Sequence, residues 1–159
     1  MIDTNELTVQ LEATLRHEIP LTLALGLTVE SYDGQTLVLG APLEPNINHK
    51  ATAFAGSLNA VVTLSGWGIV WCLLKEAGIT AKIVIQDSQV NYLLPVAGDF
   101  VAVCSKPDPA QVRRFQNMLL KKGLGRLELT AEIRSNSQPA VTFQGRYVAH
   151  LVKNPETEA

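Results

Sequence analysis

The first eighteen residues place apolar side chains at a helical period. Three leucines recur at a spacing of four residues: Leu7, Leu11 and Leu15. The cap candidate Asp3 precedes them, and Pro20 ends the pattern. Positions four apart lie on one face of an α-helix, so the pattern predicts an amphipathic first helix over residues 4–18.

Two short apolar runs come next, over residues 27–32 and 36–41, on either side of the pair Asp33-Gly34. An Asp-Gly pair supplies the positive φ that tight hairpin turns require. The two runs therefore predict a β-hairpin.

A long apolar segment follows the loop over residues 42–55, which has no periodicity. The segment begins at Gly56 and runs for about twenty residues with apolar side chains on every side, as expected of a helix that is buried all round. Lys75 and Gly78 are typical of a helix end. Gly66 and Gly68 within the helix indicate close backbone contact with a neighbouring element.

The second half of the chain is mostly extended. It predicts four strands, over residues 82–94, 100–105, 125–136 and 140–152, and a helix or helical loop over 108–122. An antiparallel sheet of about six strands wrapped around one long buried helix best explains this order, and it is an α+β fold. We expect a single domain over residues 1–153, followed by a polar tail over residues 154–159.

Length, composition and charge limit the possible functions. A chain of 159 residues suits one domain. Its 47% apolar and 18% charged residues favour a surface shared with another subunit, so we expect a homodimer or a dimer of dimers. A net charge of -2 gives no overall field to attract nucleic acid or an anionic membrane.

The two cysteines, Cys72 and Cys104, lie in apolar runs without metal-ligand spacing, and this favours buried free thiols in a reducing compartment. The acidic residues near the N-terminus do not fit a secretory signal. The longest uncharged run, over residues 51–74, contains too many hydroxyl and amide side chains for a good membrane span. We therefore expect a cytoplasmic protein.

Three stretches resemble a known superfamily: Ile19–Val29, Asn48–Ser57 and Val90–Asp99. In order and spacing they resemble the hotdog superfamily, and more narrowly the thioesterase-type proteins related to the C-terminal domain of YiiD-type bacterial proteins. The resemblance implies a hotdog fold and hydrolysis of an acyl thioester. It implies no metal and no cofactor beyond the coenzyme A or phosphopantetheine that belongs to the substrate.

Hotdog thioesterases of the phenylacetate-pathway type carry a loop of the form Asn-x-x-Gly-Thr-x-x-Gly-Gly before the central helix, which then presents an acid two turns in. Placing Asn48 on that asparagine puts Gly56 on the last glycine and Thr63 on the acid. No charged residue occurs between Gly56 and Leu74, so the usual water-activating carboxylate is missing.

The expected catalytic residues are Asn48, His49, Gly56 and Thr63. Backbone amides of Gly56 and Ser57, at the positive end of a buried helix, would polarise a thioester carbonyl. Alternatively, Gly56 only permits the turn into the helix. Asn48 would hold a carbonyl or a water, unless its amide bonds its own loop. His49 would act as the general base, and an ordinary surface histidine is the alternative.

A second group of residues is expected to bind the substrate: Phe54, Ala55, Ser57, Asn59, Asp87 and Tyr92. Asn59 and Thr63 fall on nearly one helix face with Gly56, where they could hold a water or an acyl carbonyl, or else cap or bond within the core. Asp87 could act from the partner subunit or be structural at a dimer seam. Trp67, Trp71 and Tyr92 would line an acyl channel, or belong to the core.

Five cations lie within fourteen residues: Arg113, Arg114, Lys121, Lys122 and Arg126. Such a cluster could meet the phosphates of coenzyme A or the acidic face of an acyl carrier protein. A solvated helical face is the alternative.

Three functional hypotheses follow. The first is a hydrolase of acyl-CoA or acyl-ACP thioesters. The second is an acyl-carrier decarboxylase or initiation factor of fatty-acid synthesis, because decarboxylation needs enolate stabilisation and not an activated water. The third is a non-catalytic module that binds acyl thioesters.

Overall fold

The computed structural model describes residues 2–153, so the expected polar tail over 154–159 lies outside the described residues. The elements in chain order are α1 (Thr4–Glu18), α2 (Leu21–Leu25), β1 (Thr28–Tyr32), β2 (Thr36–Ala41), the 3-10 helix η1 (Glu44–Asn46), α3 (Ala55–Glu76), β3 (Ala81–Tyr92), β4 (Phe100–Ser105), α4 (Pro109–Lys122), β5 (Leu124–Ser135) and β6 (Gln138–Leu151). Both expected long helices and all six expected strands are present.

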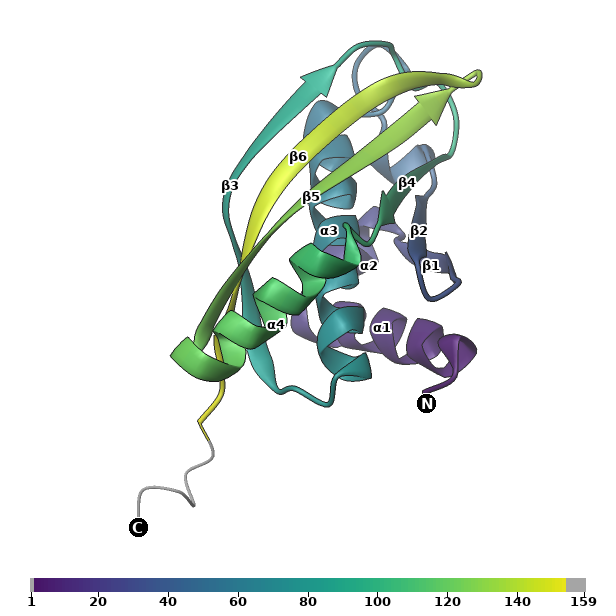
Figure 1. The fold of residues 1–159 in the computed structure, drawn as a ribbon. Coiled ribbons are helices and arrows are strands. Elements are labelled where there is room, and N and C mark those ends of the chain that lie inside the picture. The colour runs from purple at the N-terminus through teal and green to yellow at the C-terminus, as the bar shows by residue number, and fades with distance from the viewer. Residues whose placement is uncertain (1, 154–159) are drawn as a thin grey trace.

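Six antiparallel strands form one sheet in the order β1-β2-β4-β5-β6-β3. The sheet curves around α3, and α1 lies across the lower end of that helix (Figure 1). The predicted α+β hotdog fold is therefore confirmed. Among the described strands β3 pairs only with β6, which leaves it as one edge of the sheet.

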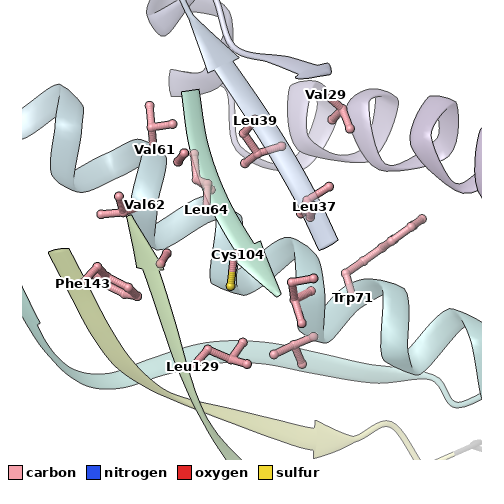
Figure 2. Close-up of a cluster of buried hydrophobic side chains, with 14 of the residues drawn as sticks. Val29, Leu37, Leu39, Val61, Val62, Leu64, Trp71, Cys104, Leu129 and Phe143 are labelled. Atoms are coloured by element: carbon pink, nitrogen blue, oxygen red, sulfur yellow. The ribbon is translucent and has the colours of Figure 1, made fainter. Parts of the chain in front are cut away.

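The core forms where α3 meets the concave face of the sheet. Figure 2 shows Val61 and Leu64 of α3 among side chains from β2, β4, β5 and β6. The two glycines in the middle of α3 make the close contacts that the sequence indicates. Gly66 lies against the ring of Tyr147 on β6, and Gly68 lies against Leu37 on β2.

Helix α3 differs from the expected pattern on one side. Four of its side chains are only half-buried and follow one stripe along the helix: Asn59, Ala60, Thr63 and Trp67. At the start of this stripe Gly56 is exposed. The prediction that the helix is buried all round is therefore wrong along this stripe. Apolar composition reports the average environment of a helix, and one polar stripe changes that average little.

Two further features of the helices add to the expected pattern. Helix α2 follows Pro20 and was not predicted, because five residues carry too little periodicity to separate a short helix from a loop. Helix α3 is long and apolar enough by composition to cross a membrane, but most of it is buried inside the sheet, as in the core helix of a soluble domain.

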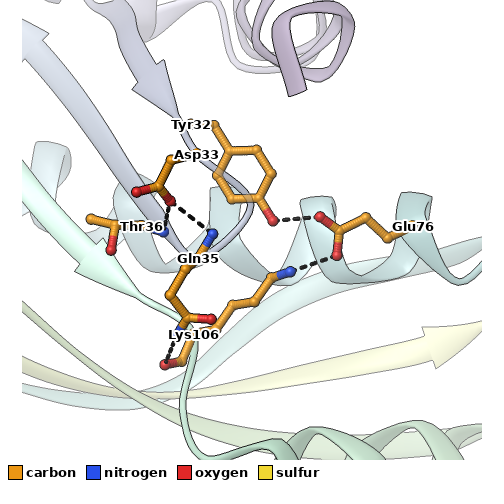
Figure 3. A network of polar contacts seen from close by, with 6 residues as sticks. All are labelled: Tyr32, Asp33, Gln35, Thr36, Glu76 and Lys106. Atoms are coloured by element: carbon orange, nitrogen blue, oxygen red, sulfur yellow. Dashed lines mark hydrogen bonds and ion pairs between the residues drawn. The ribbon is translucent and has the colours of Figure 1, made fainter. Parts of the chain in front are cut away.

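A polar network ties the C-terminal end of α3 to the sheet (Figure 3). The Tyr32 hydroxyl on β1 donates a 2.5 Å hydrogen bond to one carboxylate oxygen of Glu76. The Lys106 ammonium group, just after β4, lies 2.6 Å from the other carboxylate oxygen and 5.6 Å from the centre of the Tyr32 ring. The Lys106 side chain is only 14% exposed, so this ion pair is shielded from solvent more than a surface pair is.

Candidate active site

The loop between η1 and α3 is anchored by an asparagine that sequence reasoning missed. Asn46 is buried, and its side-chain amide donates to the backbone carbonyls of Leu25 at 2.9 Å and Pro42 at 2.8 Å. Its own carbonyl accepts a 2.7 Å bond from the Phe54 amide. Asn46 therefore fixes the loop at both ends. The only sequence signal was an asparagine beside prolines in a loop without periodicity.

Asn48 organises the same loop from within. Its side-chain oxygen accepts from the amides of Lys50 at 2.8 Å and Thr52 at 3.2 Å, and its side-chain nitrogen donates to the Thr52 hydroxyl at 3.0 Å. Both ends of the Asn48 amide are thus engaged with its own loop, as in the expected alternative. Binding a substrate or a water would need one of these bonds to be exchanged.

The tip of the loop contains an unusual backbone conformation. Ala51 has a φ of 60°, in the left-handed region that favours glycine, and it stands where the family loop has its first glycine. Next to this turn His49 is exposed. The loop therefore leaves His49 exposed to solvent, six residues before the start of α3.

The start of α3 presents three amides without partners. Among the described residues, no acceptor bonds the backbone N–H groups of Ala55, Gly56 and Ser57, while the next amide, of Leu58, donates to the Phe54 carbonyl at 3.1 Å. No side chain of residues 2–153 caps the helix, and Ala55 and Gly56 are exposed. These amides form the positive end of a 22-residue helix and are suited to bind an oxyanion.

Two aromatic side chains flank these amides. The Phe54 ring lies against Gly56, where any side chain would overlap it. The Tyr92 hydroxyl, at the end of β3, donates to the Ala55 carbonyl at 3.3 Å. Both rings are about half exposed. The structure thus brings the end of β3 to the start of α3, as the expected grouping of Phe54, Ala55 and Tyr92 requires.

The half-exposed stripe of α3 leads away from this point. Two turns beyond Gly56, the Thr63 hydroxyl donates to the Asn59 side-chain oxygen at 3.2 Å. Further along, Trp67 and Trp71 line a pocket of about 620 Å³ between α3 and the beginning of β3, together with apolar residues such as Ile83. The stripe therefore changes from polar to aromatic along the helix.

Within this chain, Asp87 lies apart from the residues at the start of α3. Its carboxylate is 3.5 Å from the Arg146 guanidinium, on the sheet face turned away from α3. A larger hollow of about 770 Å³ on that face is lined by Gln89, Asn91 and other polar residues, and by none of the expected catalytic residues. We identify the candidate site by the unpartnered amides at the start of α3 and not by the volume of a hollow. Among residues 2–153, no group of three histidine, cysteine or acidic side chains could hold a metal.

A curved antiparallel sheet around one helix, with free amides at the start of that helix, defines a hotdog domain of the thioesterase class. The chain belongs to the family described as "Putative thioesterase (yiiD_Cterm)", whose model matches residues 8–151. The predicted family resemblance is thereby confirmed, and thioesterase activity is supported at the level of the family.

Solved structures agree with this assignment. A protein of unknown function from Chlorobaculum tepidum is 34% identical, with a TM-score of 0.90 over 94% of this chain and 97% of that one. A "putative thioesterase" from Shewanella oneidensis is 29% identical, with a TM-score of 0.83 over 92% and 99%. The Escherichia coli PaaI protein of the phenylacetic acid degradation operon shares the fold at 13% identity and a TM-score of 0.65 over 96% and 98%.

Proposed function

We propose that this protein hydrolyses acyl thioesters carried by coenzyme A or by an acyl carrier protein. The observation that carries the proposal is the set of three unpartnered amides at the exposed start of α3, between Phe54 and Tyr92. A thioester carbonyl that accepts from Gly56 and Ser57 gains most from these amides when negative charge develops on its oxygen, so they favour the transition state over the ground state.

The proposed reaction is addition of water to the thioester carbon. His49 takes a proton from the water, the tetrahedral oxyanion rests on the amides of Gly56 and Ser57, and the carbon–sulfur bond then breaks. The thiolate takes up a proton and leaves, and the acyl group departs as a carboxylic acid. Asn48 sets the loop that holds His49, and it can position the water by exchanging one loop bond. Asn59 and Thr63 would bond polar atoms of the bound acyl group.

The proposal includes a homodimer formed through β3, with a dimer of dimers as the larger assembly. This edge strand is twelve residues long, and its exposed apolar side chains include Val84 and Ile85. An unpaired edge of this kind is a template for pairing with another chain. In a two-fold antiparallel pair, the Tyr92 end of one copy meets the Ala81 end of the other. The α3 start of each copy would then lie beside the pocket of Trp67 and Trp71 in the other, which would take the acyl chain.

Thiol release from a panel of acyl-CoA and acyl-ACP substrates, measured by a thiol reagent, tests the proposal. We expect His49→Ala to lower kcat/KM by about 10²-fold or more, because general-base catalysis contributes about that much. The matched control is His17→Ala, an exposed histidine of α1, which should leave the rate unchanged. Absence of thiol release from every substrate would remove the hydrolase.

One observation favours a second candidate, the acyl-carrier decarboxylase or initiation factor. No carboxylate occurs on α3 between Gly56 and Leu74, whereas the free amides could stabilise an enolate as well as an oxyanion. Release of carbon dioxide from malonyl thioesters would select this reaction. Tight acyl-CoA binding with neither reaction would select a binding module. All three activities fit a cytoplasmic protein, because buried free thiols suit a reducing compartment.

A further inference from the structure

The charge of the chain is distributed unevenly around α4. Residues 106–126 contain six lysines or arginines and one acidic residue, in a chain whose net charge is -2. The excess positive charge of this segment must therefore be outweighed by negative charge elsewhere. This uneven distribution creates a local positive field around α4 that attracts anions, although the net charge of the chain is negative.

Part of this charge converges on a groove between α4 and the strands β5 and β6, which we call the α4 groove. Its volume is about 530 Å³. Arg114, Met118 and Lys122 line it from one face of α4, at a spacing of four residues. Arg126 and Arg146 line it from the strands, and Leu124 adds apolar surface above the buried ring of Phe115. Sequence reasoning missed Arg146, because twenty residues separate it from the other cations.

The cations of the groove are available to a ligand. Within residues 2–153, neither Arg114 nor Lys122 has an acidic partner, and Arg126 donates only through Nε, to the Gln86 side-chain oxygen at 3.1 Å. The one carboxylate in the groove, that of Glu128, accepts from Arg146 at 2.9 Å and is thereby neutralised. Two guanidinium groups and one ammonium group remain free to meet phosphate oxygens.

We propose that the α4 groove binds the phosphate-bearing nucleotide end of coenzyme A, a 3′-phosphorylated adenosine diphosphate. This inference rests on the proposed function and names the carrier of its substrate. The free cations match the several negative charges of that group, and the apolar surface of Met118 and Leu124 suits the adenine ring. A hollow that gathers cations around apolar side chains suits a small nucleotide better than the broad face of a carrier protein.

The position of the groove is compatible with the candidate active site. Arg126 and Arg146 contact Gln86 and Asp87 in the middle of β3. From Asp87 the strand continues for five residues to Tyr92, a distance of about 17 Å at about 3.3 Å per residue. An extended pantetheine arm spans a distance of this order. The nucleotide and the thioester would thus occupy the two ends of one carrier.

Calorimetric titration with adenosine 3′,5′-bisphosphate and with coenzyme A tests the groove directly. The Arg114→Gln/Lys122→Gln double variant removes two groove cations. The Arg113→Gln/Lys121→Gln double variant removes the same charge from the same helix at residues that do not line the groove. We expect the first to raise both Kd values at least about tenfold, the equivalent of one lost charge-assisted hydrogen bond. The second should change them by less than about twofold, as expected of exposed charges.

Kinetics separate this inference from the proposed function. The groove variant should raise KM for acyl-CoA and leave kcat unchanged, and acyl-pantetheine, which lacks the nucleotide, should be hydrolysed alike by both variants. Equal weakening by the two double variants, or by neither, overturns the groove even if hydrolysis is observed. A KM effect confined to acyl-ACP overturns it in favour of a carrier protein. Bisphosphate binding that depends on the groove, with no hydrolysis of any thioester, keeps the groove and removes the hydrolase.

Discussion

The Tyr147 hydroxyl on β6 donates a 2.6 Å hydrogen bond to the backbone carbonyl of Thr63, in the middle of α3. Its ring lies against Gly66, where any side chain would overlap the hydroxyl. The side chain is fully buried, and burial raises the pKa of Tyr147 above its usual value. Strand and helix are thus held together beside the half-exposed stripe that carries the candidate site.

This contact predicts a stability effect. Tyr147→Phe removes the hydroxyl and leaves a buried carbonyl without its extra donor, so the free energy of unfolding should fall by about 1–2 kcal/mol. Urea denaturation measures this change. The matched control is Tyr92→Phe, which removes an exposed hydroxyl bonded at 3.3 Å and should change stability by less than about 0.5 kcal/mol. Equal losses in the two variants would contradict the role of Tyr147.

Phe54 and Gly56 predict a non-additive effect on activity. Gly56→Ala keeps the backbone amide but places a methyl group in the space of the Phe54 ring, so the ring or the helix start must shift. We expect kcat/KM to fall about tenfold or more, because catalysis depends on the placement of the amides. In a Phe54→Ala background the same change should have little further effect. Additive losses in the double variant would show that the ring is not the cause.

Ala51 predicts a stabilising substitution. An L-residue in the left-handed region costs about 1–2 kcal/mol, and glycine avoids this strain but loses about 0.5–1 kcal/mol through its flexible unfolded chain. Ala51→Gly should therefore raise the free energy of unfolding by up to about 1 kcal/mol. Ala77→Gly, at an exposed residue with a φ of −87°, is the control and should lower it. Destabilisation by both changes would count against strain at Ala51.

The two buried thiols predict how stability depends on alkaline pH. Burial raises the pKa of Cys72 and Cys104 from 9.0 to about 12. The unfolded chain loses these protons near pH 9 while the native chain keeps them, so the stabilising contribution is complete below pH 9 and is lost as pH rises toward 12. Between pH 9 and about pH 12, each thiol reduces the free energy of unfolding by at most about 1.4 kcal/mol per pH unit, because only the unfolded chain has lost the proton.

Urea denaturation at pH 8, 9 and 10 measures this decline. Cys72→Val removes one thiol at similar side-chain volume, and its stability should fall less steeply over this range than that of the native chain. The stability of both proteins at pH 7 provides the baseline. Parallel curves for the two proteins would rule out the Cys72 thiol as a cause.

The exposed edge of β3 predicts an effect on assembly. Light scattering should give twice the 17.2 kDa mass of the chain. Val84→Lys with Ile85→Lys should shift the mass to that of a monomer, because paired strands would bring the added charges together near the two-fold axis. Val101→Lys on β4 alters a similarly exposed valine away from this edge and should leave the dimer intact. A monomeric native chain would refute pairing through β3.

Local patterns in the sequence predicted most of the elements. These signals are local in the chain: the leucines of α1 and the apolar run of α3 show a helical or apolar pattern, and the Asp33-Gly34 turn shows a backbone preference. The predicted ends of the strands agree with the structure to within two residues. The order in which the strands pair was not predicted and came only from the structure.

The candidate site was predictable only in part. The loop, the start of α3 and its missing carboxylate follow from the order of Asn48, Gly56 and Thr63 along the chain. By contrast, the contacts of Tyr92 with Ala55 and of Arg146 with Glu128 join residues 37 and 18 positions apart. The engagement of the Asn48 amide with its own loop could be stated only as an alternative, because the same side chain can bond a loop or a ligand.

The sequence by itself therefore determined a hotdog domain with one apolar helix and a polar loop before it. Tertiary structure decided which side of that helix stays open, which amides lack partners, and which cations share a groove. The physical reason is range: periodicity and turn preference act between neighbours in the chain, whereas exposure and hydrogen-bond satisfaction depend on strands that arrive from distant positions. Tyr147 opposite Gly66 shows this, because both were visible in the sequence and only the folded sheet brought them together.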